Sequence, residues 1–158
     1  MRNRATIAAL FVAMALAGAP AHACIRMVPV ELADIEYADV VVVGRIGHYE
    51  IIGDADHIGS YAKFHMLVEE VLLGNAAQEI SVTWDNSTFT LPKTMASGPF
   101  LIALREPGSE MPPLRSSGTI FPGPKSDLLT LLQAPCSSPF MFASGSESAK
   151  AIRQMLHR

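Results

Sequence analysis

The sequence concentrates its potential metal ligands between residues 48 and 65, which include His48, Asp54, Asp56, His57 and His65. Two histidines and a carboxylate can hold a single metal ion. However, the two aspartates and His57 lie in a glycine-flanked segment typical of an exposed turn, and His65 lies on the polar face of an expected strand. We therefore expect no metal and no cofactor. A small exported metal-dependent hydrolase that uses His48, His57 and His65 is the alternative function.

The sequence evidence for other catalytic groups is weaker than that for the histidine cluster. Glu69 and Glu70 could be paired carboxylates for acid/base chemistry, but neighbouring residues on a strand point to opposite faces. The sequence contains no Gly-x-Ser-x-Gly motif of the kind that presents a nucleophilic serine. Cys136 could act as a nucleophile only as a free thiol. We therefore assign no catalytic residue and expect a protein that is not an enzyme.

Residues 1–23 have the three parts of a secretory signal. Arg2 and Arg4 form a basic start, residues 7–17 are an unbroken apolar run, and Ala21 and Ala23 are the small residues required for cleavage. His22 fits a lipid-attachment motif poorly, so a lipoprotein is the weaker interpretation. We expect a mature chain that begins at Cys24 in the periplasm or outside the cell.

Cys24 and Cys136 are the two cysteines of the chain. An even number of cysteines in an oxidising compartment favours a disulfide. Two buried free thiols are the alternative, and a zinc site would need closely paired cysteines that the sequence lacks. We expect Cys24 and Cys136 to be bonded to each other.

Composition excludes several classes of protein. With 49% hydrophobic and 17% charged residues, most of the chain is not intrinsically disordered. Residues 24–158 contain 10 basic and 15 acidic residues, a net charge of −5. Such a chain, without a run of basic residues, is a poor binder of nucleic acid or of an anionic membrane surface. No later stretch is apolar for 18 residues, so we expect no membrane span and one domain over residues 24–158.

The hydrophobic pattern predicts mainly β structure. Residues 30–37 resemble a short helix, and residues 38–46 a buried strand with four consecutive valines. Residues 61–72 and 79–85 alternate with the period of two that is typical of strands. Residues 100–105 and 128–132 are further strands, with another short one suggested at residues 118–121.

We expect these strands to form an antiparallel barrel followed by a helix. Its interior should contain every second side chain of each strand: Val41, Val43, Phe64, Met66, Val68, Ile80, Val82 and Leu101, with Trp84 also in the core. A capping box from Ser144 to Glu147 begins the terminal helix. Ala149, Ile152 and Leu156 then form an apolar stripe at helical spacing.

A family resemblance follows from the order of these segments. After the leading Cys24 and the short helix come "ADVVVVGRI", "VEEVLLGN", "ISVTW" and "GPFLIAL". This order resembles exported bacterial proteins with an OB-fold of the netrin-module type, a fold shared by the tissue inhibitors of metalloproteinases. The resemblance covers about residues 24–105. It implies a small OB-like Greek-key barrel of five to six strands, with an N-terminal and a C-terminal helix, and an N-terminal cysteine tied to the barrel.

The N-terminal residues are the candidate contact with a partner. In the metalloproteinase inhibitors, the amine and carbonyl of the first cysteine of a Cys-x-Cys start bind the zinc of the protease. Here Cys24, Ile25 and Arg26 have an arginine where the second cysteine belongs, so only the role of Cys24 as a mature terminus carries over. The favoured function is an exported non-catalytic binding module that engages another envelope or extracellular protein through a loop or its N-terminus.

Overall fold

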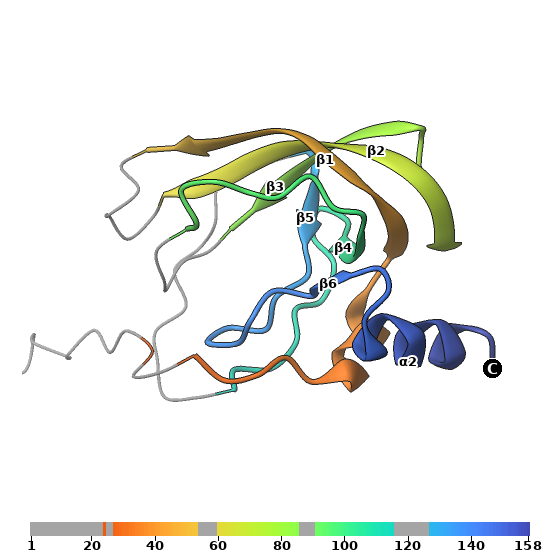
Figure 1. The fold of residues 1–158 in the computed structure, drawn as a ribbon. Coiled ribbons are helices and arrows are strands. Elements are labelled where there is room, and N and C mark those ends of the chain that lie inside the picture. Colours follow the sequence, from red (N-terminus) through yellow and green to blue (C-terminus); the bar gives the residue numbers. More distant parts are fainter. Residues whose placement is uncertain (1–23, 25–26, 54–59, 86–90, 116–126) are drawn as a thin grey trace, which may run out of the picture.

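Five strands close into a barrel in the computed structural model, which describes residues 24, 27–53, 60–85, 91–115 and 127–158 (Figure 1). In chain order, the described elements are η1 (Leu32–Tyr37), β1 (Val40–Ile52), β2 (Tyr61–Leu73), β3 (Glu79–Trp84), β4 (Phe100–Arg105), β5 (Leu129–Leu131), β6 (Met141–Ala143) and α2 (Glu147–Leu156). The barrel order is β1-β2-β3-β5-β4, closed by pairing of β4 with β1, and β6 extends beyond β4. The expected mainly β, OB-like barrel with two helices is confirmed.

One strand pair differs from the antiparallel expectation. β3 and β5 are parallel, whereas the other strand pairs of the described sheet are antiparallel. The reason is geometric: strand direction cannot alternate all the way around a closed ring with an odd number of strands. A barrel of five strands must contain a parallel pair, so an entirely antiparallel barrel was the wrong expectation.

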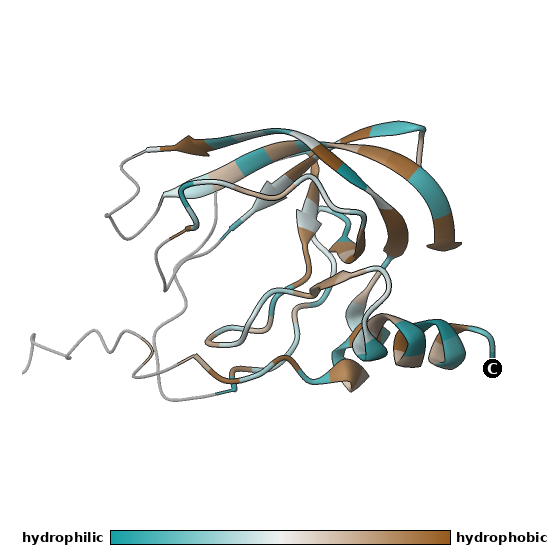
Figure 2. Cartoon of the chain, in the orientation of Figure 1, coloured by the Kyte–Doolittle hydropathy of each residue, from teal (hydrophilic) through white to brown (hydrophobic). Residues whose placement is uncertain are grey.

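Two cores lie on opposite faces of β1 and β4. The barrel interior is lined by alternate residues of both strands, including Val42 of β1 and Leu104 of β4. It also contains Phe64, Met66, Val82 and Trp84, as expected, with Val68 and Ile80 packed at its edge. In the first half of β2, hydrophobic and hydrophilic residues alternate, as on a strand with one dry face (Figure 2).

The remaining three expected interior residues belong to the second core. Val41, Val43 and Leu101 face outward from the barrel and pack with residues of η1, α2 and the segment that precedes β6. This second layer buries the outer face of both strands. Because β1 and β4 are apolar on both faces, alternation alone did not identify which face points into the barrel, and these three residues were assigned to the wrong one.

The terminal helix lies against the barrel as the apolar stripe predicted. Ala149 and Ile152 of α2 are fully buried in the second core, and Leu156 packs beside them. The helix begins differently from the prediction, because its N-cap is Ser146, whose side chain accepts a hydrogen bond from the Ala149 backbone N–H at 3.2 Å. Ser144 is therefore not the capping residue.

Short segments were the hardest to assign. The first helix is a 3-10 helix, and the 128–132 segment contributes only the three residues of β5. The three-residue strand β6 had no sequence prediction at all. The strand suggested at residues 118–121 lies outside the described residues. Elements this short carry too few alternating positions for a reliable periodicity.

A partly buried carboxylate follows β3 directly. Burial raises the pKa of Asp85 to about 6, although the positive charge of Arg105 opposes this rise. The Asp85 Oδ1 atom is buried and has no hydrogen-bond partner among the described residues. The ionised form of Asp85 is therefore disfavoured in the folded protein, and its charge destabilises the fold relative to the unfolded chain.

We expect Asp85→Asn to stabilise the protein at neutral pH. Because the folded-state pKa of Asp85 lies above its ordinary value, the stabilisation that protonated Asp85 provides is complete below pH 3.8 and is lost as the pH rises through about 6. The gain from the variant should thus increase between pH 4 and pH 7 and then level off. Urea unfolding at several pH values measures it, with the exposed Asp127→Asn as control. A gain independent of pH would contradict this assignment.

Candidate protein-binding site

A disulfide fixes the N-terminal segment to the barrel. Cys24 and Cys136 are bonded, with their Cα atoms 5.5 Å apart and a sequence separation of 112. The predicted pairing is confirmed, and neither cysteine is a free thiol. Because one end of this bond lies just before β6, the bond joins the start of the described chain to the outer layer of the fold.

Hydrogen bonds continue the attachment beyond the disulfide. The Val28 backbone N–H donates to the Cys136 carbonyl at 2.9 Å, and the Ser138 N–H donates to the Val28 carbonyl at 3.0 Å. Val28 and Ser137 form a parallel β-bridge. The Ser138 hydroxyl also lies 3.3 Å from the sulfur of Met27. Residues 27–28 are therefore held against residues 136–138 by both backbone and side chain.

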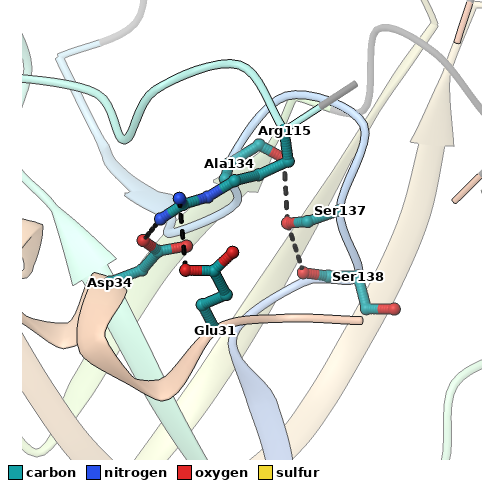
Figure 3. A network of polar contacts seen from close by, with 6 residues as sticks. All are labelled: Glu31, Asp34, Arg115, Ala134, Ser137 and Ser138. Atoms are coloured by element: carbon teal, nitrogen blue, oxygen red, sulfur yellow. Dashed lines mark hydrogen bonds and ion pairs between the residues drawn. The ribbon is translucent and has the colours of Figure 1, made fainter. Parts of the chain in front are cut away.

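A third segment joins at the same place (Figure 3). The Arg115 backbone N–H donates to the Pro135 carbonyl at 3.2 Å. Its guanidinium forms an ion pair with Asp34 of η1 and lies 3.2 Å from a Glu31 carboxylate oxygen. The hydrogen bond with Asp34 raises the pKa of Arg115. Since Asp34 is only 2% exposed, this ion pair fixes the segment before residue 116 onto η1.

The loop of residues 134–138 is itself ordered by local bonds. The Ser137 hydroxyl contacts the carbonyl oxygens of Ala134 and Ser138, at 2.9 and 3.0 Å. The Gln133 amide donates to the Ser137 carbonyl at 2.6 Å and its oxygen accepts from the Trp84 indole N–H at 2.7 Å. Trp84, which is 6% exposed, thus has a core role, as expected, and connects this loop to the barrel interior.

Two large apolar side chains are exposed around this loop. Met27 is 46% exposed and Leu114 is 40% exposed. Each belongs to a segment that is hydrogen-bonded to residues 135–138. We call residues 27–28, 114–115 and 134–138 the N-terminal docking region. It combines a fixed backbone with exposed apolar side chains, which is the combination a protein partner can use.

Of the predicted contact residues, the structure describes only Cys24, which is bonded to the docking region at Cys136. Cys24 is partly buried and disulfide-bonded, while Ile25 and Arg26 lie outside the described residues. Sequence reasoning missed Arg115 and Asp34, which are separated by 81 positions. No local sequence pattern indicates such a pair, because Asp34 is one of several acidic residues in and beside the helical segment.

The histidine cluster is only partly brought together. His48 and His65 are neighbours on β1 and β2, with ring centroids 6.1 Å apart. Asp54, Asp56 and His57 lie outside the described residues. Within the described ranges, no group of three or more potential ligands is arranged to hold a metal ion.

The paired glutamates have structural partners. Glu69 forms an ion pair with Arg45 of β1 at 2.8 Å. Glu70 receives two hydrogen bonds from Arg153 of α2, at 2.8 and 2.6 Å, which lower the pKa of Glu70. The two carboxylates thus have different partners, as expected for adjacent strand residues whose side chains point to opposite faces.

A shallow acidic pocket lies at the end of η1. It has a volume of about 510 Å³ and is lined by Glu36, Tyr37, Ala38, Asp39, Ser109 and Glu110. Asp39 accepts a hydrogen bond from the Glu106 backbone N–H at 2.8 Å. Contacts from Ser109 and this N–H lower the pKa of Asp39, so this carboxylate helps to hold the turn that forms the pocket wall.

Comparison with known proteins assigns no family. No protein-family model matches the chain, and no curated protein sequence gives a significant match. In the part of the chain that the structure describes, no helix combines the length and the apolar character needed to cross a membrane.

Proposed function

We propose that this chain is an exported, non-catalytic binding module, an OB-like barrel of the netrin-module type. It engages another envelope or extracellular protein through the N-terminal docking region. The observation that carries the proposal is the attachment of Cys24 and Val28 to residues 136–138, by the Cys24–Cys136 disulfide and the backbone hydrogen bonds of Val28.

Attachment matters because chain termini are ordinarily mobile. A partner that binds a mobile terminus must order it, and that ordering reduces the free energy gained on binding. Here the backbone of Val28 is already hydrogen-bonded to residues 136 and 138, and the neighbouring Pro135 is hydrogen-bonded to Arg115, which forms an ion pair with Asp34. The exposed side chains of Met27 and Leu114 can then bury apolar area without a large loss of entropy.

Export supports the same function. Disulfides persist in oxidising compartments such as the periplasm and the extracellular space. Cleavage after Ala23 places the new α-amine on Cys24, directly beside the docking region. The mature terminus would then be presented to a partner at a fixed position on the surface.

We expect the mature protein to capture a partner from its own envelope extract through this region. The bait is residues 24–158 with the disulfide intact, immobilised through the C-terminus. In Figure 1, the C-terminus lies on the opposite side of the fold from residues 27–31 (orange). Captured proteins are identified by mass spectrometry, and the intact mass of native protein checks the start at Cys24.

The matched variants are Met27→Glu and Leu67→Glu. Both place a charge on an exposed apolar position, 46% and 52% exposed respectively, but Leu67 lies on β2, outside the docking region. Met27→Glu should abolish capture of the protein that wild type enriches, while Leu67→Glu retains it. Equal capture by both variants, or a mature start away from Cys24, would refute the proposed mode of binding.

A further inference from the structure

A β-bulge places two histidines side by side on the outside of the barrel. Ile46 pairs with Met66, and Tyr49 pairs with Phe64, so Gly47 and His48 together oppose the single residue His65. Bulges of this kind redirect side chains and are common beside functional sites.

The bulge determines on which side of the sheet His48 lies. Ile46 is buried in the barrel, and strict alternation from it would direct His48 to the same interior. The extra residue instead leaves His48 exposed and returns Tyr49 and Ile51 to the inner core. The two imidazole rings meet as a result, with centroids 6.1 Å apart and planes inclined by 71°.

Each histidine has a carboxylate beside one ring nitrogen. His65 Nδ1 lies 3.4 Å from a Glu79 oxygen on β3, and His48 Nε2 lies 3.8 Å from a Glu50 oxygen on β1. A carboxylate that accepts the N–H of one ring nitrogen leaves the other nitrogen with its lone pair free, and most metal-binding histidines in proteins are supported in this way. Glu79 is close enough to accept from His65 Nδ1–H, which leaves His65 Nε2 free to bind an ion. The His48–Glu50 contact is too long for a hydrogen bond, so either ring nitrogen of His48 can bind the ion.

From the bulge, the ring contact and the two carboxylates, we propose that His48 and His65 form a surface chelate for a divalent late transition-metal ion such as Zn²⁺. Imidazole is a preferred ligand for Zn²⁺ and for its neighbours Ni²⁺ and Cu²⁺. A zinc ion lies about 2.0–2.1 Å from each histidine nitrogen, so a shared ion would lie between the two rings, whose centroids are 6.1 Å apart.

Water completes the coordination of the ion, because the described residues supply no third ligand at this place. Glu79 orients the His65 ring, and the carboxylates of Glu50 and Glu79 both add negative charge near the ion. The site goes beyond the proposed binding function and does not depend on it, since it lies on strands β1 and β2, away from the residues of the docking region.

The test is titration of the untagged mature protein with Zn²⁺ alone, followed by calorimetry and by NMR of the histidine side chains. We expect saturable binding of one ion per chain, with the ring signals of His48 and His65 perturbed and that of His157 unchanged. His48→Ala and His65→Ala should each abolish this binding, whereas His157→Ala, which removes an exposed histidine at the end of α2, retains it.

Both histidines are substantially exposed, with side-chain exposures of 66% and 41%, so their variants should fold, and circular dichroism checks that they do. Absence of saturable binding to wild type would overturn the proposal. Binding that survives in either His48→Ala or His65→Ala would also overturn it, because the ion would then have other ligands, such as the α-amine of Cys24 or His57.

Discussion

Cys136→Ser should lower the free energy of unfolding by up to about 4.7 kcal/mol, the chain-entropy value for a disulfide that closes a loop of about 100 residues. The observed bond spans 112 positions, so without it the unfolded chain gains the conformational entropy of a long open loop, and this favours unfolding. Serine is close to cysteine in size, and the φ of 70° at residue 136 is equally unusual for both residue types. Loss of the bond is therefore the main effect. Denaturant unfolding of the two proteins measures it.

The matched controls are Cys24→Ser and the double variant. If the bond alone is responsible, each single variant and the double variant should have the same stability, and a reductant should destabilise only wild type. Alkylation of non-reduced wild type should label neither cysteine. Unequal single variants would instead indicate that one cysteine contributes through packing, and two labelled thiols in wild type would contradict the disulfide itself.

The sequence predicted the barrel well where strands have one dry face. In β2, residues Phe64 and Met66 alternate with Lys63 and His65, and the interior side was assigned correctly. In β1 and β4, apolar residues occupy both faces, so the same rule had two solutions. Both faces of β1 and β4 are in fact buried, one in the barrel interior and the other under a second layer built from η1, α2 and the segment before β6. The four consecutive valines do not by themselves indicate this second layer.

The candidate site was predictable only in its covalent part. Two cysteines leave one pairing to consider, and that pairing is present. The contacts that fix the region, between Arg115 and Asp34 and between Val28 and residues 136–138, join segments distant in sequence. Likewise, the bulge at Gly47 and His48 depends on where Ile46 and Tyr49 pair with β2, and strand register across a bulge is not encoded in either segment alone.

Phe64→Ala should cost about 3–5 kcal/mol of unfolding free energy, the usual range for truncating a buried phenylalanine. The Phe64 side chain is fully buried in the barrel interior, on a strand that pairs with β1 on one side and β3 on the other. Because both flanking strands are fixed by their own pairing, the barrel can close only partly around the missing ring. The resulting cavity adds to the lost transfer free energy. Urea unfolding with an unchanged m-value would show that stability, and not the unfolded state, has changed.

Phe142→Ala is the matched control, since it makes the same chemical change on β6, at the edge of the second core. Phe142 is partly exposed and contacts Phe140 edge-on, with centroids 5.2 Å apart. Its truncation should cost clearly less than that of Phe64, because water already reaches one side of the ring and less apolar area is lost. Equal costs would mean that the outer layer is packed as tightly as the barrel interior. A negligible cost at Phe64 would place its ring outside the core and overturn the register of β2.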